Sequence, residues 1–269
     1  MPNLRWLLCV TCLTVTPFLA GAQTSAQVEL ELGMDACKHA KFEEAIFHFK
    51  NATALDPENE AAHQNLANAY LQNFIPGVDI PDNVATGEAA IREYQAVLRI
   101  NPRSLESVKK VAYISSMMKK FDDAKSFYRK ALGLDSVDVE SYYSIGMIDW
   151  TQAYSKRMAV RTKLALKVEQ PLIDAPECWD VWRSNEQLVT EGIDSLSRAI
   201  ELRRDYDDAM AYMNLMFREK AEIQCGNLVE YAANIKAADS WVDQTIATKK
   251  RKQADADRKA ATLQEAKKP

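Results

Sequence analysis

LGMDACKHAKFEEAIFHFKNATALDP, residues 32–57, is the stretch of this sequence that decides the fold. Its apolar residues recur at the spacing of two amphipathic helices separated by a short turn. Gly33 leaves room for a second helix to approach closely, and Phe49 is the large side chain that fills the adjacent space. Pro57 ends the second helix because proline cannot donate an intrahelical hydrogen bond. The stretch therefore predicts an antiparallel helical hairpin.

Small, aromatic and helix-ending residues recur at similar offsets further along the chain, which is the signature of an internal repeat. The repeat is most regular in the first hairpin, in the third and at the start of the fourth. The residues expected to pack these repeats are Leu32, Gly33, Ala45, Phe49, Ala52, Pro57, Ala124, Tyr128, Ala131, Ile145 and Gly146.

This pattern of Leu-Gly, Ala, aromatic, Ala and Pro resembles the motif of the tetratricopeptide repeat (TPR) protein family. The resemblance implies an all-α fold, a right-handed superhelical solenoid of antiparallel helix pairs. It also implies a concave groove, lined by the first helix of each pair, that binds an extended peptide or a partner helix without a cofactor.

We expect about five hairpins within residues 23–249, with insertions at 74–87 and 156–185. The distance from Ser136 to Arg204 is twice the repeat period, so the second insertion could instead be an extra degenerate repeat. Pro171 and Pro176 favour a single interrupted repeat, with a helix around 157–168 inside the insertion. Residues 250–269 are predicted to form a charged tail that is either helical or disordered.

Residues 1–22 are typical of a signal peptide: Arg5 precedes an apolar run, and small residues surround Ala22. Cleavage after Ala22 would export the chain to a periplasm or secrete it, whereas an uncleaved segment would be an anchor. Export would permit disulfides. Cys178 and Cys225 could then pair or remain free.

Composition argues against several functions. The 269 residues are 47% hydrophobic and 27% charged with a net charge of −4, so no positive field attracts nucleic acid. His39, His48 and His63 have no metal-ligand spacing, and no catalytic motif is present. We therefore expect no enzyme activity, no metal, no cofactor and no small-molecule substrate.

Candidate groove residues follow from the helical period along the first helices. They are Gln64, Asn68, Gln72, Lys109, Tyr113, Tyr143, Met147 and Trp150. Amides can bond a peptide backbone, and aromatic side chains supply contact area at low entropic cost. The competing interpretation is that the polar members are simply solvated and that Met147 and Trp150 belong to the core.

The leading hypothesis is an exported scaffold or adaptor that binds a protein or peptide partner through its groove. One alternative is a structural subunit of an envelope or secretion assembly complex. Another is an enzyme with its chemistry in the 156–185 insertion, which holds Glu177, Trp179, Asp180 and Trp182 but no base–nucleophile pair.

Overall fold

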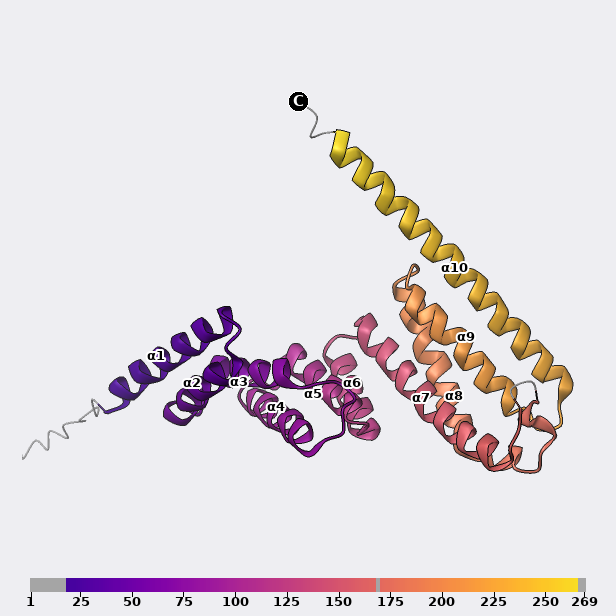
Figure 1. Ribbon diagram of the computed structural model, residues 1–269, viewed down its shortest axis with the longest axis horizontal. Helices are drawn as coiled ribbons and strands as arrows, with labels where there is room; N and C mark the ends of the chain where they lie inside the picture. Colours follow the sequence, from indigo (N-terminus) through magenta and orange to yellow (C-terminus); the bar gives the residue numbers. More distant parts are fainter. Residues whose placement is uncertain (1–17, 168–169, 266–269) are drawn as a thin grey trace, which may run out of the picture. The chain divides into compact units, whose positions relative to one another are not determined.

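The structure is a computed structural model that describes residues 18–167 and 170–265, and every regular element in these ranges is helical. The elements are α1 (Phe18–Lys38), α2 (Phe42–Leu55), α3 (Glu60–Asn73), α4 (Pro81–Ile100), α5 (Leu105–Met117), α6 (Phe121–Leu134), α7 (Val139–Lys163), the 3₁₀ helix η1 (Leu172–Asp174), α8 (Cys178–Leu202), α9 (Asp207–Glu222) and α10 (Leu228–Glu265). Consecutive helices such as α1 and α2, or α7 and α8, pack as antiparallel pairs (Figure 1). The prediction of an all-α fold of helix pairs is confirmed.

Helix packing divides the chain into two compact units, which do not share an apolar core. Unit 1 extends to Ser107, and unit 2 begins at Val108. The core of unit 1 lies between α1, α2 and α3, and unit 2 has one core around α5–α7 and another around α7–α10.

The Leu-Gly stretch folds as predicted because Gly33 lies directly against Phe49. A Cβ atom at Gly33 would lie 2.4 Å from the Phe49 ring, so a larger residue would push the two helices apart. Gly146 has the same role in α7, where a Cβ atom would lie 2.5 Å from Leu196. These two glycines set the distance between the helices of the first and fourth hairpins.

Most residues expected to pack the repeats are buried. They are Gly33, Ala45, Phe49, Ala52, Ala124, Tyr128, Ala131, Ile145 and Gly146. Leu32 is 46% exposed. Pro57 is also exposed: it occupies the turn after α2, where its carbonyl accepts a hydrogen bond from His63. Neither residue is part of the buried core, although Pro57 does follow the end of α2 directly after its C-cap residue Asp56.

The turns that follow α1, α5 and α7 share one geometry. The left-handed residue is Ala40 (φ 56°), Lys119 (φ 58°) or Ala165 (φ 51°). In the first turn, the next amide, that of Lys41, donates to the carbonyl of Ala36, and the other two turns repeat this bond. This is the Schellman motif, and here it occurs without its usual glycine.

The first predicted insertion is partly helical. Only residues 74–80 form a loop, and Pro81 to Gly87 are the first turns of α4, because proline is well suited to the first helical position. The buried side chain of Asn83 fastens this loop: it accepts from the amide of Ile75 and donates to the carbonyls of Ile75 and Val78.

The second predicted insertion is mostly an extension of its hairpin rather than a separate segment. Helix α7 continues to Lys163, so the helix expected around 157–168 is its last part. Helix α8 begins at Cys178 rather than at Glu186. Residues 164–177 connect the two helices and include η1.

A disulfide joins Cys178 to Cys225, with the two Cα atoms 5.5 Å apart. It ties the start of α8 to the turn between α9 and α10. The sequence left this pairing open. Cys178 is the first residue of α8. Cys37 remains a free thiol.

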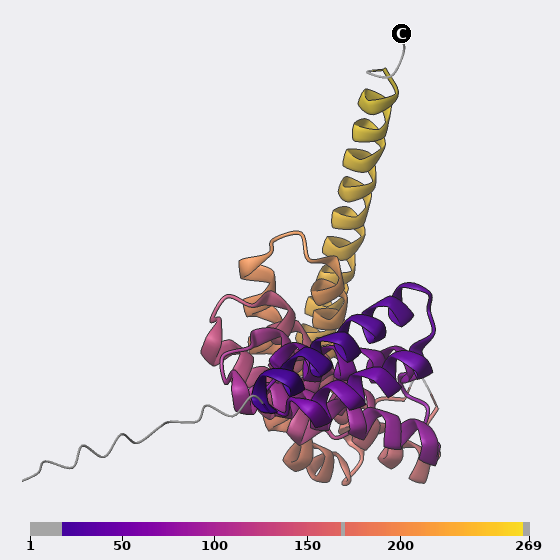
Figure 2. The same ribbon diagram turned by 90° about the vertical axis from the view of Figure 1, so that its left-hand side faces the viewer.

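The predicted tail lies within α10, which continues without a break to Glu265, and residues 266–269 lie outside the described part. Figures 1 and 2 both show its C-terminal part extending beyond α9. Of the predicted signal peptide, residues 1–17 lie outside the described ranges, and α1 begins at Phe18. None of the described helices is both long and apolar enough to cross a membrane.

Candidate functional site

The groove residues predicted in unit 1 lie on α3, and two of them hold the unit together. Asn68 accepts a hydrogen bond of 2.6 Å from the hydroxyl of Tyr94, and Gln64 accepts one of 3.1 Å from Ser107. Burial raises the pKa of Tyr94, so its hydroxyl stays a donor at neutral pH. Gln72 is exposed. The amides of Gln64 and Asn68 therefore have structural partners within the unit.

On α5, Lys109 pairs with Asp138 at 2.6 Å. Asp138 is the N-cap residue of α7 and accepts from the amide of Ser141, so this ion pair joins α5 to the start of α7. Tyr113, one turn further along α5, is 38% exposed. A pocket of about 280 Å³ opens beside these residues. It is lined by Lys109, Lys110, Tyr113, Tyr128, Glu140 and Ser144.

An aromatic cluster continues from this pocket along α7 and across to α9. The ring of Tyr143 lies 5.6 Å from that of Tyr212, and Trp150 lies 5.4 Å from the same ring, both edge to face. Trp150 also stacks on Tyr154 at 5.2 Å. We call Tyr143, Trp150, Tyr154 and Tyr212 the aromatic face. Its members on α7 follow one another at helical spacing, and Tyr154 is 40% exposed.

Two residues predicted for the groove, Tyr143 and Trp150, thus belong to one cluster, while Met147 packs against the core around α5–α7. The sequence prediction missed Tyr154 and Tyr212. Tyr154 could have been found, since it lies one turn beyond Trp150 on the same stripe. Tyr212 could not, because only packing places α9 beside α7.

The phenols around the aromatic face remain protonated hydrogen-bond donors. Burial raises the pKa of Tyr143, and it also raises the pKa of Tyr206, whose hydroxyl donates to Glu140 at 2.9 Å. Glu140 pairs in addition with Arg203 at 2.9 Å. This arrangement fixes the rings before any ligand arrives, which lowers the entropic cost of binding.

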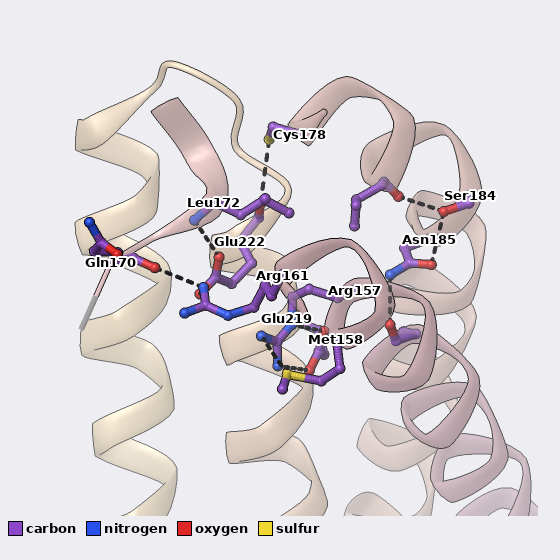
Figure 3. Close-up of polar contacts among 12 residues, drawn as sticks. Arg157, Met158, Arg161, Gln170, Leu172, Cys178, Ser184, Asn185, Glu219 and Glu222 are labelled. Atoms are coloured by element: carbon purple, nitrogen blue, oxygen red, sulfur yellow. Dashed lines mark hydrogen bonds and ion pairs between the residues drawn. The ribbon is translucent and has the colours of Figure 1, made fainter. Parts of the chain in front are cut away.

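The far end of α7 is fastened to α9 by buried ion pairs (Figure 3). Arg157 donates two hydrogen bonds to Glu219, at 2.7 and 2.8 Å, and its guanidinium lies 5.3 Å from the Tyr154 ring. Arg161 donates to the carbonyls of Lys167 and Gln170, and so holds the connection that follows α7. These polar groups form hydrogen bonds with one another within the chain, and Arg157 contacts the end of the aromatic face at Tyr154.

Three of the four residues weighed for an enzyme in 156–185 make structural contacts. Trp179 and Trp182 pack edge to face at 5.9 Å, and Asp180 pairs with Arg183. Glu177 is the N-cap residue of α8 and makes no side-chain cap hydrogen bond there. The histidines do not gather either: His48 pairs with Glu29, and His63 with Glu93. Within the described ranges, no group of three His, Cys, Asp or Glu side chains is placed to hold a metal ion.

Comparison with known proteins agrees with this architecture. The model of the TPR repeat matches residues 40–73, which span α2 and α3. A crystal structure of MamA is 13% identical and superposes with a TM-score of 0.59, over 86% of this chain and 94% of MamA. A MamA fragment from Desulfovibrio magneticus RS-1 is 12% identical, with a TM-score of 0.56 over 84% of this chain and 96% of the fragment.

The structure of YrrB, described as a TPR protein with an unusual peptide-binding site, is 13% identical with a TM-score of 0.51. That superposition covers 87% of this chain and 98% of YrrB. No curated protein sequence is significantly similar to this chain. At such low identity the solved structures establish the fold alone. Together with the matched repeat, they confirm the resemblance to TPR proteins.

Proposed function

We propose that this chain is a protein-interaction scaffold that binds an extended partner segment along α7, on the aromatic face of unit 2. The observation that carries the proposal is the contact of Tyr143 and Trp150 with the same ring, that of Tyr212 on the neighbouring first helix. Tyrosine and tryptophan are the residue types that most often dominate binding energy at protein interfaces.

The surroundings of the aromatic face suit a peptide. The pocket beside Tyr113 is of a size to accept one side chain, and Lys110 supplies a cation at its rim. The Glu140 and Arg157 ion pairs hold the rings from both ends. YrrB, a protein of similar fold, is described as having an unusual peptide-binding site, which makes a peptide the first ligand class to test here.

Export is a separate part of the proposal. The signal-like residues 1–22 and the disulfide between Cys178 and Cys225 favour an oxidising compartment outside the cytoplasm. Mass spectrometry of the protein purified from its native host would test this, since cleavage after Ala22 leaves Gln23 as the first residue. A chain that retains residues 1–22 in the cytosolic fraction would rule export out.

Peptide binding is tested by selecting from a displayed peptide library on the full chain. Fluorescence anisotropy then measures the affinity of the selected peptide for variants. We expect Trp150→Ala and Tyr154→Ala to weaken binding about tenfold or more, since truncating an interface hot spot costs over 1 kcal/mol. Phe47→Ala, an exposed aromatic on α2, is the matched control and should leave affinity unchanged.

Equal affinities for all three variants, or no selected peptide, would contradict the proposal. The assembly-subunit alternative has a different signature. Photo-crosslinkers placed at Tyr113 and Tyr154 in living cells would then give one abundant adduct of fixed stoichiometry, rather than several minor adducts.

A further inference from the structure

A second surface of unit 2 lies at the disulfide, and it combines exposed apolar side chains with carboxylates. Trp179 is 54% exposed at the start of α8. Leu228 and Val229, the first two residues of α10, are 63% and 78% exposed. Such side chains at the ends of two helices gain nothing from folding, because they stay in water.

The covalent and hydrogen-bonded links of this region bring these residues together. Trp179 directly follows Cys178, and Leu228 is three residues beyond Cys225, the other half of the disulfide. The amide of Gly226 donates to the carbonyl of Ile173 at 2.9 Å, and the amide of Leu172 donates to Glu222 at 2.8 Å. Figure 3 shows Cys178, Leu172 and Glu222 at the same end of the unit. These links hold η1, the start of α8 and the turn before α10 together.

Four carboxylates are close in sequence to these apolar residues. Asp174, Glu177, Asp180 and Glu230 each lie within five residues of Trp179 or of Leu228 along the chain. Asp180 pairs with Arg183, and the other three add negative charge to this region. An acidic rim around an apolar centre repels the anionic headgroups of a membrane and attracts cationic groups.

We propose that this surface, which we call the disulfide tip, docks a basic amphipathic segment of a partner protein. Its apolar side chains would cover Leu228 and Val229, and its lysines or arginines would meet the carboxylates. The exposed face of Trp179 also suits a guanidinium or ammonium group through a cation–π contact. Because the disulfide fixes the tip before the partner binds, little conformational entropy is lost on docking.

The disulfide tip and the aromatic face are different surfaces, so the two proposals can fail separately. The probe is a short synthetic peptide of alternating lysine and leucine, with a glutamate–leucine peptide as its charge-reversed counterpart. Fluorescence anisotropy with the full, oxidised chain measures binding. Phosphatidylcholine vesicles with and without phosphatidylglycerol, in a flotation assay, test a lipid surface as the alternative occupant.

We expect the lysine peptide to bind and the glutamate peptide not to bind. Trp179→Ala should weaken binding about tenfold, as truncation of an aromatic anchor does. Glu230→Lys should weaken it as well, whereas Glu43→Lys, the same charge change on α2, should not. Phe47→Ala and Tyr154→Ala should leave it unchanged. Thermal melts confirm that each variant is folded.

The proposal is overturned by any of three results: no binding of the lysine peptide, equal loss with Glu43→Lys and Glu230→Lys, or flotation with vesicles that Trp179→Ala abolishes. Loss of binding with Tyr154→Ala alone would instead assign the peptide to the aromatic face.

Discussion

Asp149 on α7 lies 2.5 Å from the ammonium group of Lys125 on α6, and both side chains are buried. Lys125 also contacts Glu191 on α8 at 2.8 Å. Three helices from two successive hairpins thus meet at one buried cation. Burial raises the pKa of Asp149 to about 7, although Lys125 opposes the shift.

The raised pKa predicts how Asp149→Asn changes stability with pH. Between pH 4 and 7 the folded protein holds a proton on Asp149 that the unfolded chain releases, so wild-type stability falls as pH rises. The asparagine variant lacks this proton. Its free energy of unfolding relative to wild type should therefore increase with pH, by at most about 1.4 kcal/mol per unit. Urea denaturation at pH 5 and pH 8 measures the difference.

Lys125→Met provides the control for this cluster. At pH 8 it leaves the Asp149 carboxylate buried without its partner, a defect that typically costs about 3–5 kcal/mol. At pH 5 the carboxyl is neutral and the loss should be smaller. The same loss at both pH values would show that Asp149 does not titrate in this range.

The left-handed residues Ala40 and Lys119 predict stabilising substitutions. A non-glycine residue in this conformation costs about 1 kcal/mol, so Ala40→Gly and Lys119→Gly should each raise the free energy of unfolding by about 0.5–1 kcal/mol. Chemical denaturation measures the change. Ala232→Gly, on the exposed face of α10, is the matched control and should lose a similar amount. If the turn variants also lose stability, the left-handed conformation of Ala40 and Lys119 does not lower the stability of the wild type.

The contact between Gly33 and Phe49 predicts that Gly33→Ala is destabilising. The added methyl group would overlap the ring, and overpacking of this kind costs about 1–3 kcal/mol. The double variant Gly33→Ala/Phe49→Leu should recover part of that loss, because the smaller side chain makes room. Thermal melts of Gly33→Ala, of Phe49→Leu and of the double variant show whether the second substitution is compensating or merely additive.

Removal of the disulfide should destabilise unit 2. Cys178 and Cys225 are 47 residues apart. Closing a loop of that length lowers the entropy of the unfolded chain, which stabilises the folded state by about 3–4 kcal/mol. Cys178→Ser/Cys225→Ser should lower the urea midpoint, and reductant should shift the wild type but not this variant. Cys37→Ser should respond to reductant as the wild type does; otherwise the sensitivity comes from the free thiol.

Asn68→Ala should cost about 1–3 kcal/mol, because the buried hydroxyl of Tyr94 loses its acceptor. Tyr94→Phe/Asn68→Ala removes both partners and should be less damaging than Asn68→Ala alone. This double-mutant cycle, measured by urea denaturation, separates a structural role of Asn68 from a binding role. If Asn68→Ala has the same free energy of unfolding as the wild type, Asn68 is again a candidate groove residue.

The helical hairpins could be predicted because glycine, alanine, aromatic and proline residues act locally, at fixed offsets. The lengths of α7 and α8 could not, because Pro171 and Pro176 signal a break without showing which helix extends up to it. Part of the candidate site could be read from the sequence. The helical period alone places Tyr143 and Trp150 on one face of α7. Their contact with Tyr212 depends on α9, a helix distant in sequence. The bonds of Asn68 and Lys109 depend equally on tertiary packing.

The ion pair of Lys252 with Asp207 joins α10 to the start of α9. The side chains described beyond it are almost all exposed. A dozen helical residues without tertiary support are marginal in water. Backbone amides before Lys252 should therefore exchange slowly with deuterium, and those after it within seconds. The two parts of this unbroken helix thus differ in their stability against local unfolding. A protease that cleaves after lysine and arginine would remove its outer end while leaving the hairpins intact.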